Sequence, residues 1–433
     1  MISQRVDHID RCPSNRTAVK FVCRLIACAL VVRNSFVRNS FAGNSVSGFA
    51  YKTSCRSTCL LVILASLLSS CADSQPVEWT FNGTAMGTTW QATLVLPKAA
   101  SKDNSPGINL ATTRVPPNQL QRQIQSAIEQ LLDSINQLMS TYEPTSALSR
   151  FNATQSTDWI DQPAPVIALL RSAAAVSEKT QGAYDVTLGG LVNLWGFGSD
   201  RDYDASQTVL PDQVTQALDQ VGFRLLQYSA DDRQVRKQVA SLQVDLSSIA
   251  KGYTVDRVGD MLEDMGIDRY LFELGGEIRT RGLSAEDSAW VIALESPQLS
   301  GVESGLQAIN AIAVHNAHIA TSGDYRNYRE LDGRRISHLI DGRTGYPVTN
   351  RLASVTVLHS STELADVWAT AFMLIGADAA LTMADDADLA VSLTLREEGG
   401  FTTRNSRAFE AYLLDNERSR LSFTARLKRL FGS

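Results

Sequence analysis

The chain has 433 residues, of which 44% are hydrophobic and 20% charged, a composition typical of a globular protein with an apolar core. All six cysteines lie within residues 1–71, which excludes a disulfide-stapled scaffold and a thiolate zinc site in the remaining chain. The formal net charge is −6, but residues 1–70 are basic, so the rest of the chain is strongly acidic and argues against a nucleic-acid partner.

A short apolar run at residues 60–68 follows two basic residues and precedes Ser69-Ser70-Cys71. A signal peptide has basic residues first, then an apolar run and then small residues. This apolar run is too short to span a bilayer as a helix. The string 68–71 resembles a bacterial lipobox, which predicts cleavage before Cys71 and a lipid on its thiol. The alternative is an ordinary signal peptide with an incidental cysteine.

The leader predicted from this signal covers residues 1–70, and a lipidated tether covers residues 71–79. Residues 1–50 fit the signal poorly, because a signal peptide normally begins the chain. We hypothesise that residues 1–50 are a mis-assigned start and that translation begins later, near residues 46–52. A lipid on Cys71 would make the protein a membrane-anchored lipoprotein facing the periplasm of a bacterium.

We expect residues 80–414 to form a single domain, whose elements follow from hydrophobic periodicity. Loose alternation predicts a strand over residues 80–96, and the Pro-, Asn- and Ser-rich residues 97–118 predict a loop insertion. Apolar residues three and four apart predict helices over residues 120–138, 164–179, 211–221, 249–265 and 362–375.

Strands are predicted over residues 270–274, 289–295, 309–314 and 352–359. Strands and helices come in mixed order rather than in regular alternation, which favours an α+β fold over a doubly wound sheet. The final residues 415–433 form a basic tail with interleaved Leu and Phe, which is either a helix on a membrane surface or a plain solvated terminal helix.

Common nucleotide and metal motifs are absent from the sequence, which has no Walker A loop, no G-x-G-x-x-G after a strand and no H-E-x-x-H. Among five histidines, only His315 and His318 have the spacing of helical ligands. We interpret that pair as structural, because it falls in a strand-to-loop stretch.

A candidate oxygen site lies on the predicted helix 362–375, where Asp366 and Thr370 are four residues apart and share a face. A carboxylate and a hydroxyl are hard oxygen ligands that suit Mg²⁺. The alternative is an acidic residue favoured near the helix N-terminus by the helix dipole. A second candidate is the strand-to-helix junction 245–256, where Lys251 and backbone groups could receive a phosphate.

These segments and several others follow one order along the chain, although each taken singly is typical of a turn. Together they resemble the ApbE family, the FAD:protein FMN transferases, over about residues 80–395. One departure is Gly342, where many members of the family have proline, and it could loosen that turn. The matching strings are Gly83–Thr88, Met139–Glu143, Ser149–Asn152, Gly182–Thr187, Leu194–Gly198, Asp245–Asp256, Leu274–Glu277, Thr321–Tyr325, Ser337–Gly345 and Asp366–Thr370.

The resemblance implies an enzyme that binds FAD and Mg²⁺, moves the FMN half onto a Thr or Ser hydroxyl of a target protein through a phosphoester bond, and releases AMP. Carried over position by position, it implies that the side chains of Asp366 and Thr370 and the backbone carbonyl of Ser248 bind the metal. The residues implied to contact FAD are Met86, Tyr142, Ala183, Tyr184, Asp185, Asp245, Lys251 and Ile340.

His338 is the leading candidate for the base that deprotonates the acceptor hydroxyl, because the pKa of an unperturbed histidine is near neutral. Asp341 is the second candidate, and His338 could instead be a loop residue that shapes the FAD pocket. The same site could hydrolyse FAD to FMN and AMP. A protein that binds FAD without turnover is a further alternative, although the Asp366–Thr370 pair argues against it.

The partners implied are FAD, the membrane that holds Cys71, and an acceptor protein. By analogy with the family, the acceptor would be a flavoprotein subunit of a membrane redox complex facing the periplasm. No nucleic-acid partner is expected, because the body of the chain is acidic.

Overall fold

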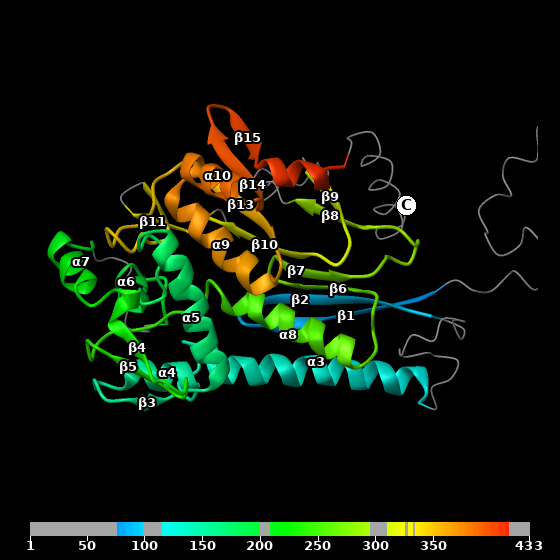
Figure 1. Ribbon diagram of the computed structural model, residues 1–433, viewed down its shortest axis with the longest axis horizontal. Helices are drawn as coiled ribbons and strands as arrows, with labels where there is room; N and C mark the ends of the chain where they lie inside the picture. The colour runs from blue at the N-terminus through cyan, green and yellow to red at the C-terminus, as the bar shows by residue number, and fades with distance from the viewer. Residues whose placement is uncertain are drawn as a thin grey trace, which may run out of the picture. The chain divides into compact units, whose positions relative to one another are not determined.

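The centre of the fold is an eight-stranded sheet with the strand order β1-β2-β6-β7-β10-β13-β14-β15 (Figure 1). Every neighbouring pair in this sheet is antiparallel. The strands are β1 (Val77–Ala85), β2 (Thr88–Leu96), β6 (Tyr270–Leu274), β7 (Glu277–Arg281), β10 (His318–Gly323), β13 (Leu352–His359), β14 (Ala390–Glu397) and β15 (Gly400–Asn405).

The computed structural model describes residues 76–97, 115–199, 208–294, 310–324, 328–331 and 334–414. All of them belong to one unit, Ser74–Ser433. The predicted leader, Cys71, most of the loop insertion 97–118 and the basic tail 415–433 lie outside the described residues.

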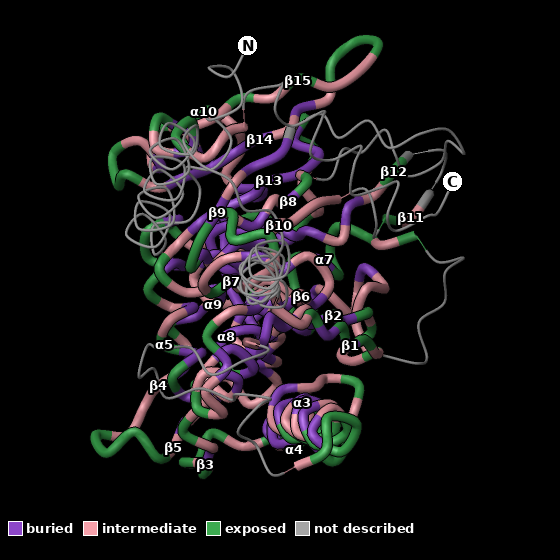
Figure 2. The backbone as a smooth tube through the Cα atoms, turned by 90° about the vertical axis from the view of Figure 1, so that its right-hand side faces the viewer, coloured by how far each residue is buried: buried purple, intermediate pink, exposed green. Residues whose placement is uncertain are grey.

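Helices cover one face of the sheet. Helix α3 contacts β1, α8 contacts β6 and β7, α9 contacts β10 and β13, and α10 contacts β14, while α5 packs against α9. Buried residues gather in the central strands and in α8 and α9 (Figure 2). These helices are α3 (Pro117–Met139), α5 (Ala164–Lys179), α8 (Ala250–Asp264), α9 (Thr362–Ile375) and α10 (Ala377–Asp386).

Helix α3 forms because its apolar residues recur on one face. Pro117 stands at its first turn, where a missing amide hydrogen costs nothing because that amide would have no partner in the helix. The helix predicted over residues 120–138 is therefore confirmed, with a slightly earlier start. Its buried residues, spaced by three or four positions, are Leu120, Ile124, Ile128, Leu132, Ile135 and Met139.

The opposite face of the sheet carries the hairpin β8–β9 and the 3₁₀ helix η4. Alternation along β2 separates the two faces, since Leu94 and Leu96 pack on the helix side whereas Val95 packs in a cluster with Trp290. The sheet is thus buried on both sides. The bounds are β8 (Trp290–Leu294), β9 (Asn310–Val314) and η4 (Arg407–Tyr412).

Smaller elements complete the described chain. Strands β3, β5 and β4 form a three-stranded antiparallel sheet, and β11 pairs with β12 in a hairpin that leads directly into His338. The bounds are α4 (Ala147–Ala153), β3 (Ile160–Asp161), α6 (Gly189–Leu194), α7 (Pro211–Leu218), η2 (Phe223–Leu225), β4 (Leu226–Tyr228), β5 (Gln234–Lys237), β11 (Tyr328–Leu331) and β12 (Arg334–Ser337).

The predicted α+β class is confirmed, and two details at the start of the domain differ. The strand predicted over residues 80–96 is the hairpin β1–β2, which turns at Met86 and Gly87 with positive φ at both residues (51° and 76°). Two-residue turns of this kind match the twist of the flanking strands. Strand β1 begins at Val77, before the predicted domain start, because Val77 pairs with Leu96.

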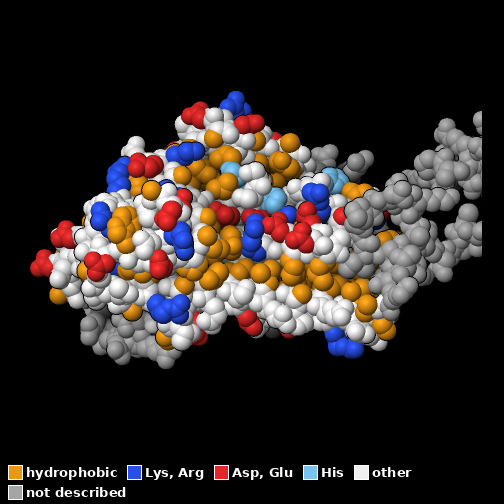
Figure 3. Space-filling model, turned by 60° about the horizontal axis from the view of Figure 1, so that its bottom comes forward, with side chains coloured by type: hydrophobic (Ala, Val, Ile, Leu, Met, Phe, Trp, Pro, Cys, Tyr) orange, Lys and Arg blue, Asp and Glu red, His pale blue; other side chains and the backbone are white. Residues whose placement is uncertain are grey.

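Two properties of the described residues bear on possible partners, namely the apolar length of the helices and the distribution of surface charge. None of the described helices is long and apolar enough to cross a membrane. The face shown in Figure 3 carries acidic and basic side chains side by side, without one large basic patch. Opposite charges also pair between β7 and α8, where the Arg279 guanidinium lies 2.8 Å from the Asp260 carboxylate and 2.7 Å from the Glu263 carboxylate.

Candidate active site

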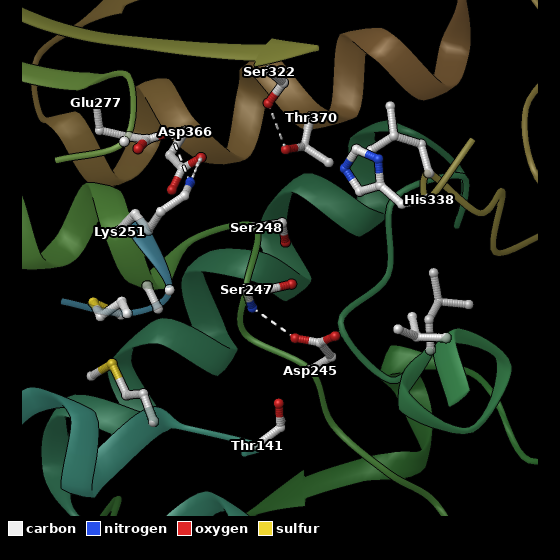
Figure 4. Close-up of a pocket in the computed structure, with 18 of the residues that line it drawn as sticks. Thr141, Asp245, Ser247, Ser248, Lys251, Glu277, Ser322, His338, Asp366 and Thr370 are labelled. Atoms are coloured by element: carbon white, nitrogen blue, oxygen red, sulfur yellow. Dashed lines mark hydrogen bonds and ion pairs between the residues drawn. The ribbon is translucent and has the colours of Figure 1, made fainter. Parts of the chain in front are cut away.

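A cavity of about 790 Å³ lies at one end of the main sheet, where the β1–β2 turn, the β6–β7 turn and the end of β10 meet (Figure 4). The end of α3, the loop before α8, the segment after β12 and the middle of α9 complete its walls. Segments far apart in the sequence therefore form one pocket, of the size usual for small-molecule sites.

Asp366 lies on α9 at a point of close approach between α8 and α9. Its Oδ2 accepts a hydrogen bond of 3.0 Å from the backbone amide of Gly252, and its side chain is buried. Gly252 permits this approach, because a Cβ atom there would lie 2.4 Å from the carbonyl oxygen of Thr362. Burial raises the pKa of Asp366 above its ordinary value.

Lys251 reaches into the cavity beside two buried carboxylates. Its Nζ lies 2.8 Å from Oε1 of Glu277 and 3.8 Å from Oδ1 of Asp366 (Figure 4). The second oxygen of Glu277, Oε2, is buried and has no hydrogen-bond partner among the described residues. Burial raises the pKa of Glu277, against the attraction of the lysine.

Further oxygen donors line the same cavity. The Thr370 hydroxyl, one turn along α9 from Asp366, lies 2.9 Å from the hydroxyl of Ser322 at the end of β10. Ser248 precedes α8, and no amide in the described part of the chain donates to its carbonyl, since the Gly252 amide bonds to Asp366 instead. A carboxylate, a hydroxyl and a carbonyl are donors that could hold a divalent cation.

The other walls carry an acid, a tyrosine and a histidine. Asp245 accepts a hydrogen bond of 2.8 Å from the Ser247 amide, and the Tyr142 hydroxyl donates to the Phe197 carbonyl over 3.3 Å. The His338 ring stands edge-on to the Phe197 ring, with centroids 6.2 Å apart. The predicted site residues that line the cavity are Met86, Tyr142, Tyr184, Asp185, Asp245, Ser248, Lys251, His338, Ile340, Asp366 and Thr370.

Two predicted site residues, Ala183 and Asp341, are not part of the cavity lining. Ala183 is fully buried, and its carbonyl accepts a hydrogen bond from the amide of Gly342. The carboxylate of Asp341 is held by the Arg343 guanidinium, 2.6 Å away. Ala183 and Asp341 thus stand next to lining residues, and their roles towards FAD and the acceptor hydroxyl stay predictions.

Asp185 lines the cavity, but its carboxylate is largely satisfied by its own chain. Oδ1 accepts hydrogen bonds from the amide and the hydroxyl of Thr187 (2.8 and 2.6 Å), and Oδ2 accepts one of 2.7 Å from the Phe223 amide. Burial raises the pKa of Asp185 despite these bonds. Asp185 thus joins its own loop to the segment at Phe223, in addition to standing on the cavity wall.

The departure from the family pattern at Gly342 does not loosen the turn, contrary to the expectation from the sequence. Its amide donates a hydrogen bond of 3.0 Å to the Ala183 carbonyl, and a Cβ atom there would lie 2.4 Å from the Gly182 carbonyl oxygen. A proline has no amide hydrogen and could not make this bond. The glycine is closely fitted to its surroundings.

Sequence reasoning missed Glu277, Ser322 and Gly252 as site residues, although each lies in a string that it singled out. The sequence does not show where these side chains point. Glu277 and Lys251 are 26 residues apart and meet only because β7 lies against α8. The signal that could have found Glu277 is an acidic residue directly after a two-glycine turn at the start of a strand.

The interpretation of His315 and His318 as structural agrees with the geometry. Nδ1 of His318 lies 2.9 Å from Oδ1 of Asp256 and 3.1 Å from the hydroxyl of Thr362, away from the cavity lining. Within the described residues, no cluster of three or more His, Cys, Asp or Glu side chains could hold a metal ion. A cation at Asp366 would therefore depend on hydroxyl, backbone and substrate oxygens.

Residues 86–393 match the ApbE family, a span that contains every element of the cavity described above. The chain belongs to the ApbE family. The match begins at the β1–β2 turn and ends within β14, so it contains six strands of the main sheet wholly or in part and leaves out β1 and β15.

Curated relatives and solved structures of the ApbE family resemble most of the chain. The FAD:protein FMN transferase of Haemophilus influenzae is 41% identical over 286 residues, covering 65% of this chain and 81% of that protein. The enzyme of the same name from Vibrio cholerae is 37% identical over 354 residues, covering 82% and 98%.

The structures show the same fold. The flavin transferase ApbE from Vibrio cholerae aligns with a TM-score of 0.66 at 34% identity, covering 78% of this chain and 100% of that one. The apo form of the Pseudomonas stutzeri flavinyl transferase ApbE aligns with a TM-score of 0.65 at 33% identity, covering 78% and 97%.

Proposed function

We propose that the protein is an FAD:protein FMN transferase, which moves the FMN half of FAD onto a Thr or Ser hydroxyl of a target protein and releases AMP. The observation that carries this proposal is the cavity lined by Lys251, Asp366 and Thr370, in which the lysine lies 3.8 Å from the Asp366 carboxylate. A lysine and an oxygen-rich helix face suit a pyrophosphate. Relatives that bear this enzyme name match 65% and 82% of the chain.

The residues present fit a Mg²⁺ ion. Asp366 and Thr370 would hold it through their side chains and Ser248 through its carbonyl, to which no described amide donates. Two buried carboxylates, Asp366 and Glu277, face a single ammonium group, so an added cation would offset the excess negative charge. When bound, the ion would neutralise charge that develops on the pyrophosphate and on the departing AMP.

The transfer exchanges the phosphoanhydride bond of FAD for a phosphoester bond to the acceptor. The acceptor oxygen forms a bond to the phosphorus of the FMN half, the bond from that phosphorus to the AMP phosphate breaks, and AMP leaves with the bridging oxygen. Lys251 would hold the phosphate through its ammonium group. Met86, Tyr142, Tyr184, Asp245 and Ile340 would form the walls around the rest of FAD.

The proton of the acceptor hydroxyl requires a base, and we propose His338 for this role. His338 lines the cavity and Figure 4 places its ring on the same side as Thr370, whereas Asp341 is engaged by Arg343 outside the lining. An imidazole near its ordinary pKa can accept a proton at neutral pH. The geometry therefore favours His338 over Asp341.

One assay tests the function. The purified protein is incubated with FAD, MgCl₂ and a membrane extract of the producing organism, and the proteins are separated on a denaturing gel under ultraviolet light. We expect a fluorescent protein band and release of AMP. Free FMN without such a band would identify a pyrophosphatase instead, and unchanged FAD a protein that only binds it.

The same assay tests the base. His338→Ala is expected to lose the fluorescent band while FAD binding, measured by quenching of flavin fluorescence, persists. The exposed His315 supplies the matched control, and His315→Ala should keep both. Loss of FAD binding along with transfer in His338→Ala would assign His338 to the shape of the pocket.

We further propose that a lipid on Cys71 anchors the protein to a membrane on the periplasmic side, and that the acceptor is a flavoprotein subunit of a membrane redox complex. The support is the string at residues 68–71, which places a cysteine after small residues at the end of an apolar run. An anchored enzyme and a membrane-bound acceptor would share one surface.

A further inference from the structure

Glu277, a residue to which the family resemblance gave no role, lies closer to Lys251 than Asp366 does. The Nζ–Oε1 distance to Glu277 on β7 is 2.8 Å, whereas the Nζ–Oδ1 distance to Asp366 on α9 is 3.8 Å (Figure 4). The side chains of both acids are 2% exposed, and that of Lys251 is 28% exposed. The lysine therefore forms its shorter ion pair with Glu277 and a longer one with Asp366.

Charge counting shows what Glu277 changes at Asp366. With both carboxylates ionised, Glu277, Lys251 and Asp366 carry one net negative charge. Without the charge on Glu277, the ammonium group would balance Asp366 alone, and the cluster would be neutral. Charges a few ångströms apart in a partly buried site interact strongly, so this difference alters the attraction of any cation towards Asp366.

Position explains how Glu277 could hold the lysine. It is the first residue of β7, directly after the turn at Gly275 and Gly276, where φ is positive at both residues (65° and 111°). The sheet fixes its backbone, and Lys251 is fixed at the first turn of α8, which packs on β7. Two rigid elements therefore set the distance between the two charges.

We propose that Glu277 is a positioning residue, which holds Lys251 and balances its charge so that the carboxylate of Asp366 stays available for a divalent cation. The proposal rests on the transferase function and on the cation site at Asp366. Lys251 is thereby directed to a phosphate of the substrate rather than to Asp366. A direct ligand role for Glu277 Oε2, which is buried without a partner, is the competing possibility.

A double-mutant cycle separates these two roles. Mn²⁺ serves as the probe, and its binding to the full-length protein without FAD is followed by the electron paramagnetic resonance signal of the free ion. The variants are Glu277→Gln, Lys251→Met and the double variant. Glutamine has nearly the shape of glutamate and removes only its charge.

If Glu277 acts through Lys251, Glu277→Gln weakens Mn²⁺ binding by about tenfold, a change of ~1.4 kcal/mol. Lys251→Met strengthens binding, because the competing ammonium group is gone. The double variant returns to within about threefold of the wild type, because the cluster again carries one net negative charge. A double variant as weak as Glu277→Gln would overturn the proposal and make Glu277 a ligand.

Two controls keep the result interpretable. Glu129→Gln removes an exposed charge from α3, outside the cavity lining, and should bind Mn²⁺ like the wild type. Glu277→Asp keeps the charge and should retain more affinity than Glu277→Gln. Equal affinity of Glu277→Gln and wild type would also overturn the proposal, provided that both melt at similar temperatures.

Failure of this proposal is distinguishable from failure of the transferase function. The Mn²⁺ cycle uses no FAD and no acceptor, so it reads the cluster alone. Wild-type protein that binds Mn²⁺ as expected but produces no fluorescent acceptor would contradict the function and leave the role of Glu277 standing. Wild-type protein that transfers FMN, together with a Glu277→Gln variant of unaltered Mn²⁺ affinity, would support the function and contradict the role of Glu277.

Discussion

At the residue scale, Gly252 builds the site by having no side chain. A Cβ atom at this position would lie 2.4 Å from the Thr362 carbonyl oxygen and 2.8 Å from Cβ of Asp366. Because no side chain occupies this space, α8 and α9 can approach each other and the Gly252 amide donates a hydrogen bond to Asp366. The Ser248 carbonyl is left without that amide for the same reason.

We predict that Gly252→Ala destabilises the protein by about 1–3 kcal/mol, because the added methyl group must push two packed helices apart. Transfer activity should fall as well, since Asp366 would lose its amide donor. Gly190→Ala is the matched control, because Gly190 is exposed on α6 and no atom lies within 4 Å of an added Cβ. Melting temperature and the fluorescent-acceptor assay measure both effects, and an unaffected Gly252→Ala variant would contradict this reading.

At the element scale, the start of α9 is held by a residue of another helix. Asp256 on α8 accepts hydrogen bonds of 3.0 Å from the amides of Thr362 and Glu363, while Ser361 caps the amide of Leu364. The first amides of a helix have no partners within the helix, so these bonds satisfy them. Since α9 carries the candidate cation ligands, Asp256 helps to fix the site from a distance.

The charge of Asp256 makes this support dependent on pH. Burial alone would raise its pKa, but the hydrogen bond from His318 and those from the two amides outweigh burial and hold the pKa below the ordinary value of 3.8. A lowered pKa in the folded state means that Asp256 stabilises the fold above its ordinary pKa. This contribution is lost as the pH falls through the lower folded value.

We predict that Asp256→Asn lowers the stability at neutral pH by about 1–2 kcal/mol, because one oxygen and the negative charge at the helix start are lost. The difference in melting temperature from the wild type should shrink below about pH 4, where the wild-type carboxyl begins to take up its proton. Asp264→Asn, an exposed change near the end of the same helix, should stay within about 0.5 kcal/mol at every pH. A difference that does not depend on pH would argue against a role of the charge.

Elements with local patterns were predictable, and contacts between elements were not. The six buried residues of α3 recur every three or four positions, so its face towards the core could be read directly from the sequence. Asp256 and Thr362 are 106 residues apart, and no periodicity indicates that they meet. Most predicted cavity residues were found through the family resemblance, whereas Glu277 needed the packing of β7 on α8.

At the scale of the whole molecule, the strands near the N-terminus connect the proposed lipid to the catalytic body. Strand β1 starts at Val77, six residues after Cys71, and is an edge strand of the main sheet. The main-chain path from the proposed anchor to the cavity is therefore short.

We predict that Cys71→Ser moves the protein from the membrane fraction to the soluble fraction, because serine lacks the thiol that would carry the acyl chains. The soluble variant should keep FMN transfer to an acceptor supplied in solution, since Cys71 lies outside the family region. Cys59→Ser, in the leader, should leave the protein in the membrane fraction. Cys71→Ser protein that still sediments with membranes would contradict the lipid anchor.

The length of β1 limits how far from a membrane the cavity can stand. Strand β1 runs for nine residues, about 30 Å, from its start at Val77 to the turn at Met86 that lines the cavity. The six residues from Cys71 add at most about 20 Å. A lipid at Cys71 would thus confine the cavity to within about 50 Å of the bilayer, at the end of the strand remote from the lipid. Because this distance is an upper limit, an acceptor residue that stands farther than this from the bilayer would be out of reach of the cavity.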